Sequence, residues 1–92
     1  MNQEEKEFEK RAAVLKALAH PVRLRILKEL CVNKTNVTSL YTKLDVPQST
    51  ISRHLLILKN AGIVSGKRHG VEIDYSLDCQ KLEHFIKMII QD

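Results

Sequence analysis

The side chains best suited to chemistry are four polar residues spaced along one predicted helix: Gln48, Ser49, Ser52 and Arg53. At about 100° per residue they fall within an arc of roughly 140°, whereas Ile51, Leu55 and Leu58 lie on the opposite side. Arginine can bond the O6 and N7 atoms of guanine, glutamine can bond the N6 and N7 atoms of adenine, and hydroxyls reach bases or phosphates. This face suits DNA, although a solvated polar face on an ordinary surface helix has the same composition.

Proline and glycine mark the two ends of this helix. Pro47 has the fixed φ angle favoured in a first helical turn, and Gly62 is the residue type typical just past a helix end. The predicted helix has about four turns, and its polar face is crowded at the N-terminus, where unpaired backbone N–H groups favour a phosphate. We expect the apolar side to pack against the rest of the protein, which leaves the polar side exposed to a partner.

Positive charge is concentrated around this helix. The 92-residue chain has a formal net charge of +4, and residues 47–70 contain four Lys or Arg side chains and no Asp or Glu. Residues 71–92, by contrast, hold two basic and five acidic side chains. A generic surface interleaves the two signs, so a basic block is the expected footprint of a polyanionic partner.

Length and composition predict a single folded domain over residues 1–92. The chain is 43% apolar and 28% charged, which is typical of globular proteins and argues against disorder. No apolar run approaches the ~18 residues of a membrane span, and the acidic start of the chain does not fit a secretory signal. We therefore expect a cytoplasmic protein that makes no contact with a membrane.

The order of the predicted elements is α-α-α-α-β-β-α, a mainly α fold with a small β-hairpin. Apolar periodicity predicts helices over residues 4–18, 22–32, 37–44 and 79–91 in addition to the polar-faced helix. Asn36 is a good N-cap for the third helix, and Asp78 for the last. The third and fourth helices, joined by a short turn, form a helix-turn-helix at about residues 37–61, whose second helix enters the major groove of DNA.

A basic hairpin is predicted directly after the helix-turn-helix. Residues 63–77 alternate with period two around His69 and Gly70, which indicates two antiparallel strands. Lys67, Arg68 and His69 lie at the predicted tip. A basic-tipped hairpin in this place is a wing, which touches phosphates or reaches into a minor groove.

The two terminal helices carry more apolar surface than one small domain needs. The first has an apolar stripe of Phe8, Ala12, Leu15, Leu18 and Ala19. The last has a stripe of Leu82, Phe85, Ile86, Ile89 and Ile90. We expect helices 4–18 and 79–91 to pair across a two-fold axis in a homodimer, burying the face of Phe85, Ile86 and Ile89. The alternative is that both helices pack on their own subunit.

Three stretches carry a resemblance to a known family: residues 15–27 (LKALAHPVRLRIL), 48–55 (QSTISRHL) and 58–64 (LKNAGIV). In this order they resemble the ArsR/SmtB family of bacterial winged-helix repressors, and the resemblance extends from about residue 8 to residue 90. It implies a winged helix-turn-helix fold. It also implies a homodimer that binds an imperfect inverted repeat in double-stranded DNA and blocks transcription until an inducer is sensed.

The resemblance implies a set of DNA contacts. In the helix-turn-helix they fall on Thr38, Ser39, Gln48, Ser49, Thr50, Ser52 and Arg53, and in the wing on Lys67, Arg68 and His69. Thr38 and Ser39 would contact phosphate. His54 belongs to the same motif but lies nearer the apolar flank of the helix, so it is either a neighbour of DNA or a packed group.

The family's two common metal sites are not intact in this sequence. Where many relatives have a Cys-Val-Cys motif, this chain has Asn36 and Thr38 at the cysteine positions. A second site, on the last helix, reads Cys79 and Lys81 at its first two positions, and a protonated lysine is a poor ligand. We therefore expect no metal and no cofactor at these sites.

The sequence does not identify the inducer that the protein senses. Cys31 and Cys79 lie 48 residues apart, which is neither a disulfide framework nor a CxxC zinc motif. Cys31 belongs to an apolar stripe and is expected to be an inert buried thiol, whereas Cys79 begins a helix, where the dipole lowers a thiol pKa and favours oxidation. Both are candidates for redox sensing, and two further alternatives are a metal at a non-standard site and no small-molecule inducer at all.

Two other classes of protein compete with a repressor. The first is a winged-helix module for protein contact, which the acid-free stretch over residues 47–70 disfavours. The second is an enzyme, for which the sequence offers no nucleophile-base pair or pair of carboxylates on a credible cleft. We therefore expect a regulator without enzymatic activity.

Overall fold

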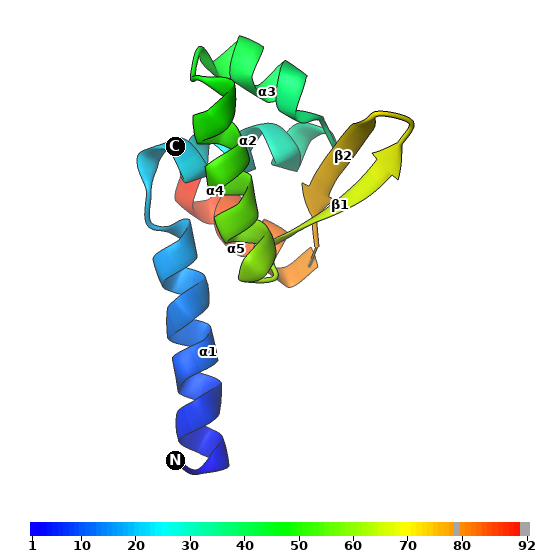
Figure 1. The fold of residues 1–92 in the computed structure, drawn as a ribbon. Coiled ribbons are helices and arrows are strands. Elements are labelled where there is room, and N and C mark those ends of the chain that lie inside the picture. The colour runs from blue at the N-terminus through cyan, green and yellow to red at the C-terminus, as the bar shows by residue number, and fades with distance from the viewer. Residues whose placement is uncertain (79, 91–92) are drawn as a thin grey trace.

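Seven elements follow one another in the computed structural model, which describes residues 1–78 and 80–90 (Figure 1). They are α1 (Gln3–Leu18), α2 (Pro21–Val32), α3 (Val37–Leu44), α4 (Gln48–Asn60), β1 (Val64–His69), β2 (Glu72–Leu77) and α5 (Gln80–Ile90). The predicted element order and the mainly α class are confirmed. Cys79, the expected first residue of the last helix, lies outside the described residues, so the expected cap by Asp78 is not tested.

The core is built from the apolar faces of α2, α3 and α4, with α5 packed against α2. Its most deeply buried side chains are Ile26, Leu27, Leu40, Ile51, Leu55, Leu58, Ile63 and Ile86, each at most 1% exposed. In α4, Ile51, Leu55 and Leu58 recur at the three- and four-residue intervals that keep side chains on one face of a helix. Burial of the apolar face of α4 leaves its polar face outside.

Side-chain caps fix the starts of the first three helices. Asn2 accepts a hydrogen bond from the Glu5 N–H at 2.8 Å, and the His20 Nδ1 atom accepts one from the Val22 N–H at 3.1 Å. The expected cap by Asn36 is confirmed, because its side-chain oxygen accepts from the Ser39 N–H at 2.8 Å. These bonds satisfy backbone donors that have no partner inside the helix.

Two arginines satisfy the carbonyl ends of helices. Arg25 donates to the Leu44 carbonyl at 2.7 Å, and Arg23 donates to the Ala17 carbonyl at 3.2 Å. Arg25 thereby ties α2 to the end of α3, where Asp45 adopts a left-handed conformation with φ of 55°. Both arginines thereby connect neighbouring parts of the fold, although Arg25 remains exposed at the surface.

Gly62 directs the chain from α4 into the wing. Its φ of 75° is in the left-handed region, and the Gly62 and Ile63 N–H groups donate to the Lys59 and Leu58 carbonyls. A residue with a Cβ atom adopts this conformation only with strain, so glycine suits the position. The predicted helix end is confirmed, and the wing begins directly beside it.

The wing is a two-stranded antiparallel hairpin whose register places His69 opposite Glu72. The turn is therefore formed by Gly70 and Val71, one residue later than the predicted His69 and Gly70. Gly66 is crossed closely by its neighbours, since an added Cβ would lie 2.8 Å from the Cγ2 atom of Ile73. The side chains of Ile73 and Tyr75 can cover this position because residue 66 has no side chain.

Both terminal helices present apolar side chains to solvent. In α1 only Ala17 and Leu18 are buried, and the N-terminal part extends away from the body with Phe8 57% and Leu15 54% exposed (Figure 1). In α5 the exposed apolar residues are Phe85, Met88 and Ile89. The expectation that Ile86 lies on a dimer face is wrong, because Ile86 is 1% exposed and packs in the core of its own subunit.

Within the residues that the structure describes, no helix combines the length and apolar character needed to cross a bilayer.

Candidate nucleic-acid interface

The polar face predicted on α4 lies at the surface. Gln48, Ser49, Ser52 and Arg53 are exposed, whereas Thr50 is half-buried. The first turn of α4 has no side-chain cap, and although the Thr50 N–H donates to the Pro47 carbonyl, the N–H groups of Gln48 and Ser49 remain available to an anion. The helix therefore presents four polar side chains and a positive dipole end on the same side.

Three elements converge at the start of α4. A cavity of about 220 Å³ is lined by Asn36, Val37, Thr38, Gln48, Ser52, Val71, Glu72 and Ile73. These residues come from the start of α3, the exposed face of α4 and the turn of the wing. Thr38 and Ser39 are exposed at the start of α3. The structure thus brings the predicted phosphate-contacting residue Thr38 next to the polar face of α4.

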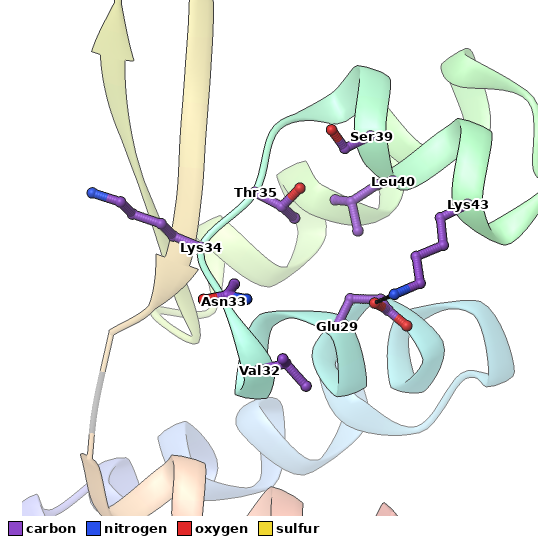
Figure 2. Close-up of a pocket in the computed structure, with 8 residues that line it drawn as sticks. All are labelled: Glu29, Val32, Asn33, Lys34, Thr35, Ser39, Leu40 and Lys43. Carbon is purple, nitrogen blue, oxygen red and sulfur yellow. Dashed lines mark ion pairs between the residues drawn. The ribbon is translucent and has the colours of Figure 1, made fainter.

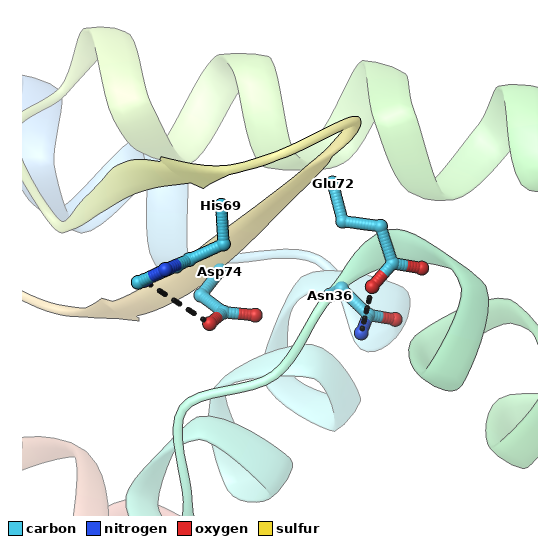
Figure 3. A network of polar contacts seen from close by, with 4 residues as sticks. All are labelled: Asn36, His69, Glu72 and Asp74. Atoms are coloured by element: carbon cyan, nitrogen blue, oxygen red, sulfur yellow. Dashed lines mark hydrogen bonds and ion pairs between the residues drawn. The ribbon is translucent and has the colours of Figure 1, made fainter.

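The wing carries its basic residues outward. Lys67, Arg68 and His69 are all exposed along β1. Two acidic residues on β2 face them, because the register pairs Lys67 with Asp74 and His69 with Glu72. The His69 Nε2 atom lies 3.6 Å from the Asp74 Oδ2 atom (Figure 3). The charge on the wing is therefore mixed, with Arg68 on the other face of the hairpin from this pair.

Sequence reasoning missed the role of Glu72 and Asp74. Charge counting assigned both to an acidic C-terminal block, whereas the hairpin folds them back beside the basic residues. The predicted turn at His69 and Gly70 already placed Glu72 across from Lys67, but the pairs Lys67–Asp74 and His69–Glu72 follow only from the observed turn one residue later. Glu72 also accepts a hydrogen bond from the Asn36 amide at 3.2 Å.

His54 is not part of the exposed surface. Its side chain is 4% exposed and its ring centroid lies 4.4 Å from that of His20. Burial, the neighbouring His20 and the Arg23 guanidinium lower the pKa of His54 from its ordinary value of 6.5, with a further contribution from Arg53. Of the two alternatives left open for His54, the burial of its ring favours the packed group, which lies between the start of α2 and the middle of α4.

Of the two candidate redox residues, the structure describes only Cys31. Cys31 is half-buried on α2, and burial raises the pKa of its thiol, as does the Glu83 carboxylate, while Lys87 acts in the opposite direction. A raised pKa keeps the sulfur as a thiol, the less reactive form, which agrees with a packing role. Cys79 lies outside the described residues. Across residues 1–78 and 80–90, no three His, Cys, Asp or Glu side chains group in a way that could hold a metal.

A second cavity, of about 200 Å³, lies between the end of α2 and α3 (Figure 2). On one side of it the Lys43 Nζ atom is 2.7 Å from the Glu29 Oε2 atom. Lys43 is thus paired with a carboxylate, while Arg23 and Arg25 donate to helix carbonyls. The exposed basic residues of α4 and the wing are Arg53, Lys59, Lys67 and Arg68.

Comparison with known proteins agrees with this geometry. Residues 20–65 match the family described as "Bacterial regulatory protein, arsR family". The transcriptional repressor PagR of Bacillus anthracis is 42% identical over 79 residues, which cover 85% of this chain and 79% of PagR. Its crystal structure superposes with a TM-score of 0.83, at 38% identity, over 92% of this chain and 98% of that one.

Two further proteins have the same fold. HlyU of Vibrio cholerae, named a transcriptional activator, is 32% identical, and its structure has a TM-score of 0.85 over 92% of each chain. The homodimeric winged helix-turn-helix DNA-binding domain of Mb0332 from Mycobacterium bovis has a TM-score of 0.91, at 26% identity, over 97% of this chain and 82% of that one. The chain therefore belongs to the arsR family of bacterial regulatory proteins and is a winged helix-turn-helix transcriptional regulator.

Proposed function

We propose that this protein is a homodimeric transcriptional repressor that binds an inverted-repeat operator in double-stranded DNA. The observation that carries the proposal is the exposed face of Gln48, Ser49, Ser52 and Arg53, held by a buried apolar face on a helix that packs beside a basic wing. Gln48 and Arg53 would read base edges, and Lys67 and Arg68 would bind phosphate.

The unpacked terminal helices support a homodimer. An isolated helix of 16 residues is marginal in water, and most of the stability of a helix in a protein comes from packing of its apolar face. The N-terminal half of α1 has no such packing within its own subunit, and Phe85, Met88 and Ile89 of α5 are also exposed. A second copy that covers both faces would place two recognition helices about 34 Å apart, one turn of DNA.

Repression rather than activation is supported by the relatives. The repressor PagR is 42% identical to this chain, whereas the activator HlyU is 32% identical. Repression requires only that a bound dimer block the promoter. The signal that releases DNA is a separate proposal, in which Cys79 or a metal at a non-standard site would act.

Binding to the DNA upstream of the protein's own gene tests the proposed function. Fluorescence anisotropy should show tighter binding to this duplex than to a random duplex of equal length, by at least about 10³-fold at 150 mM salt. Exposed Lys28, on α2, supplies the control, since Lys28→Ala should leave this ratio unchanged while Arg53→Ala lowers it. Equal affinity for both duplexes would contradict sequence-specific binding.

Parallel titrations test the signal. Zn²⁺, arsenite and peroxide should be added separately to the complex, each beside a Cys79→Ser variant. Release by peroxide that is lost in Cys79→Ser would assign a redox signal, and release by one metal alone would assign a metal site. Release by none of the three would contradict a signal from these compounds and would favour control through protein abundance or a partner.

A further inference from the structure

The wing is joined to the linker between α2 and α3 by backbone hydrogen bonds. The Thr35 N–H donates to the Tyr75 carbonyl at 3.0 Å, and the Tyr75 N–H donates to the Thr35 carbonyl at 2.6 Å. Thr35 therefore acts as a short third strand beside the middle of β2. A two-stranded hairpin alone is only marginally stable in water, so this pairing contributes to holding the wing in place.

Asn36, the next residue, makes two contacts with one side chain. Its oxygen caps α3 by accepting from the Ser39 N–H, and its Nδ2 atom donates to the Glu72 Oε2 atom at 3.2 Å (Figure 3). Glu72 is the first residue of β2, directly after the turn of the wing. Asn36 thus connects the N-terminus of the helix-turn-helix to the tip of the hairpin.

This contact lies at the cavity where α3, α4 and the wing meet. Asn36 and Glu72 both line it, together with Gln48 and Ser52 of the recognition helix. The base of the wing is joined to α4 through Gly62, and its middle is joined to the linker through Thr35. The Asn36–Glu72 bond is the side-chain hydrogen bond that joins its far end to the start of α3 among the described residues.

The Glu72 carboxylate lines this cavity, where its negative charge would repel a DNA phosphate. DNA binding gains affinity from neutralised phosphates, and Glu72 places a negative charge beside the proposed contacts. Bonding to the Asn36 amide gives the carboxylate a structural partner and directs one oxygen toward α3. The hydrogen bond to Asn36 therefore accounts for an acidic residue at this position despite the repulsion.

We propose that Asn36 and Glu72 are positioning residues for DNA binding, whose side-chain hydrogen bond sets the distance between the wing tip and the start of the recognition helix. This inference rests on the proposed function. It assigns no direct contact with DNA to Asn36, and it predicts that breaking the bond weakens the contribution of the wing while leaving the recognition helix unchanged.

Three variants separate the bond from the helix cap and from the charge. Asn36→Ser keeps a good N-cap but is too short to reach Glu72, so operator affinity should fall roughly 3- to 10-fold, the range expected for one hydrogen bond. Glu72→Gln keeps an acceptor without the charge, so affinity should stay within about 2-fold or improve. Asn36→Asp keeps the cap and places like charges together, so it should resemble Asn36→Ser.

A double-mutant cycle distinguishes positioning from a general loss of structure. In the Asn36→Ser background, Lys67→Ala should cost less affinity than in the wild-type protein, because the wing is no longer held at the duplex. Lys59→Ala, on the exposed side of α4, serves as the control and should remain additive. Full additivity of Asn36→Ser with Lys67→Ala would overturn the inference.

Hydrogen exchange in the protein without DNA gives a second readout. The amides of residues 71–73 should exchange several-fold faster in Asn36→Ser than in the wild-type protein, whereas core amides of α2 should be unchanged. Failure of the wild-type protein to bind DNA would contradict the proposed function and, with it, the role of Asn36 and Glu72 in DNA binding. Unchanged exchange at residues 71–73 would instead show that the two side chains do not brace the wing.

Discussion

At the scale of single residues, the basic side chains divide into those that hold the fold and those that face outward. Arg23 and Arg25 bond helix carbonyls, and Lys43 pairs with Glu29. Arg53 and Lys67 are exposed on the recognition helix and the wing. Substitution of these two should therefore affect DNA binding in two different ways.

Arg53→Ala should weaken operator binding by about 1 to 3 kcal/mol and relax selectivity, because a bidentate contact with a guanine is lost. Lys67→Ala should weaken binding to all sequences alike and reduce the slope of log K against log salt by about one, because one phosphate contact is lost. Titrations at several salt concentrations, on specific and random duplexes, measure both effects. Equal losses on both duplexes for both variants would contradict these separate roles.

The buried His54 ring predicts a pH-dependent stability. Its pKa is lowered below 6.5 in the folded state, so the unfolded chain binds a proton more readily. The stability that neutral His54 contributes is fully present above about pH 6.5 and is lost as the pH falls through the folded pKa. Urea unfolding at pH 7.5 and pH 5.0 should show a lower free energy of unfolding at the acidic pH.

Replacement of His54 isolates this effect. The Nδ1 atom of His54 is buried and has no hydrogen-bond partner among the described residues, so an apolar ring leaves no broken hydrogen bond there. His54→Phe should reduce the difference in unfolding free energy between the two pH values, whereas His84→Gln, at an exposed position, should not. An unchanged difference in His54→Phe would assign the pH dependence to other groups.

At the scale of elements, the caps explain why the helix-turn-helix was predictable. Asn36, Pro47 and Gly62 are residue types that mark helix ends by their own chemistry, and the observed ends of α3 and α4 agree with the prediction within one residue. The expectation for Ile86 was wrong because periodicity gives the apolar side of a helix but not which part of that side its own subunit covers. The mixed charge of the wing was missed because the register depends on one residue in the turn.

Close packing of the wing strands gives a prediction for Gly66. Gly66→Ala would place a methyl group 2.8 Å from the Ile73 Cγ2 atom and 3.2 Å from a ring carbon of Tyr75. The free energy of unfolding should fall by about 1 to 3 kcal/mol, as in other overpacked sites. Chemical denaturation measures the loss, with Ser65→Ala on the other face of β1 as a control.

Relief by a second substitution checks the physical cause. Ile73→Ala removes the Cγ2 atom that the new methyl group would meet, so the double variant should lose less stability than the sum of the two single variants. Strict additivity would mean that contact with Ile73 is not the reason for the loss.

At the scale of the whole molecule, the exposed apolar residues on α1 and α5 predict that the dimer depends on the terminal helices. Leu15→Glu and Ile89→Glu should each shift the protein toward the monomer, because each puts a charge into an apolar interface. Val32→Glu, at an exposed apolar position on α2, is the matched control. Sedimentation velocity measures the mass, and dimers that persist in both variants would place the interface elsewhere.

Operator binding should fall together with dimerisation. A monomer contacts one half-site, whereas a dimer contacts two with a single loss of translational freedom, so monomeric variants should lose affinity at concentrations where the wild-type protein is saturated. The recognition face is intact in these variants, so weak binding to a single half-site should remain. Full affinity in a monomeric variant would contradict binding as a dimer.

The most direct test of the central claim is hydroxyl-radical footprinting of the wild-type protein on its operator, combined with the protein-to-DNA stoichiometry. Two copies per duplex should protect two regions whose centres are separated by about one helical turn or a multiple of it. In Arg53→Ala both protected regions should weaken together. A single protected region bound by one copy, or protection unaffected by Arg53→Ala, would contradict the account.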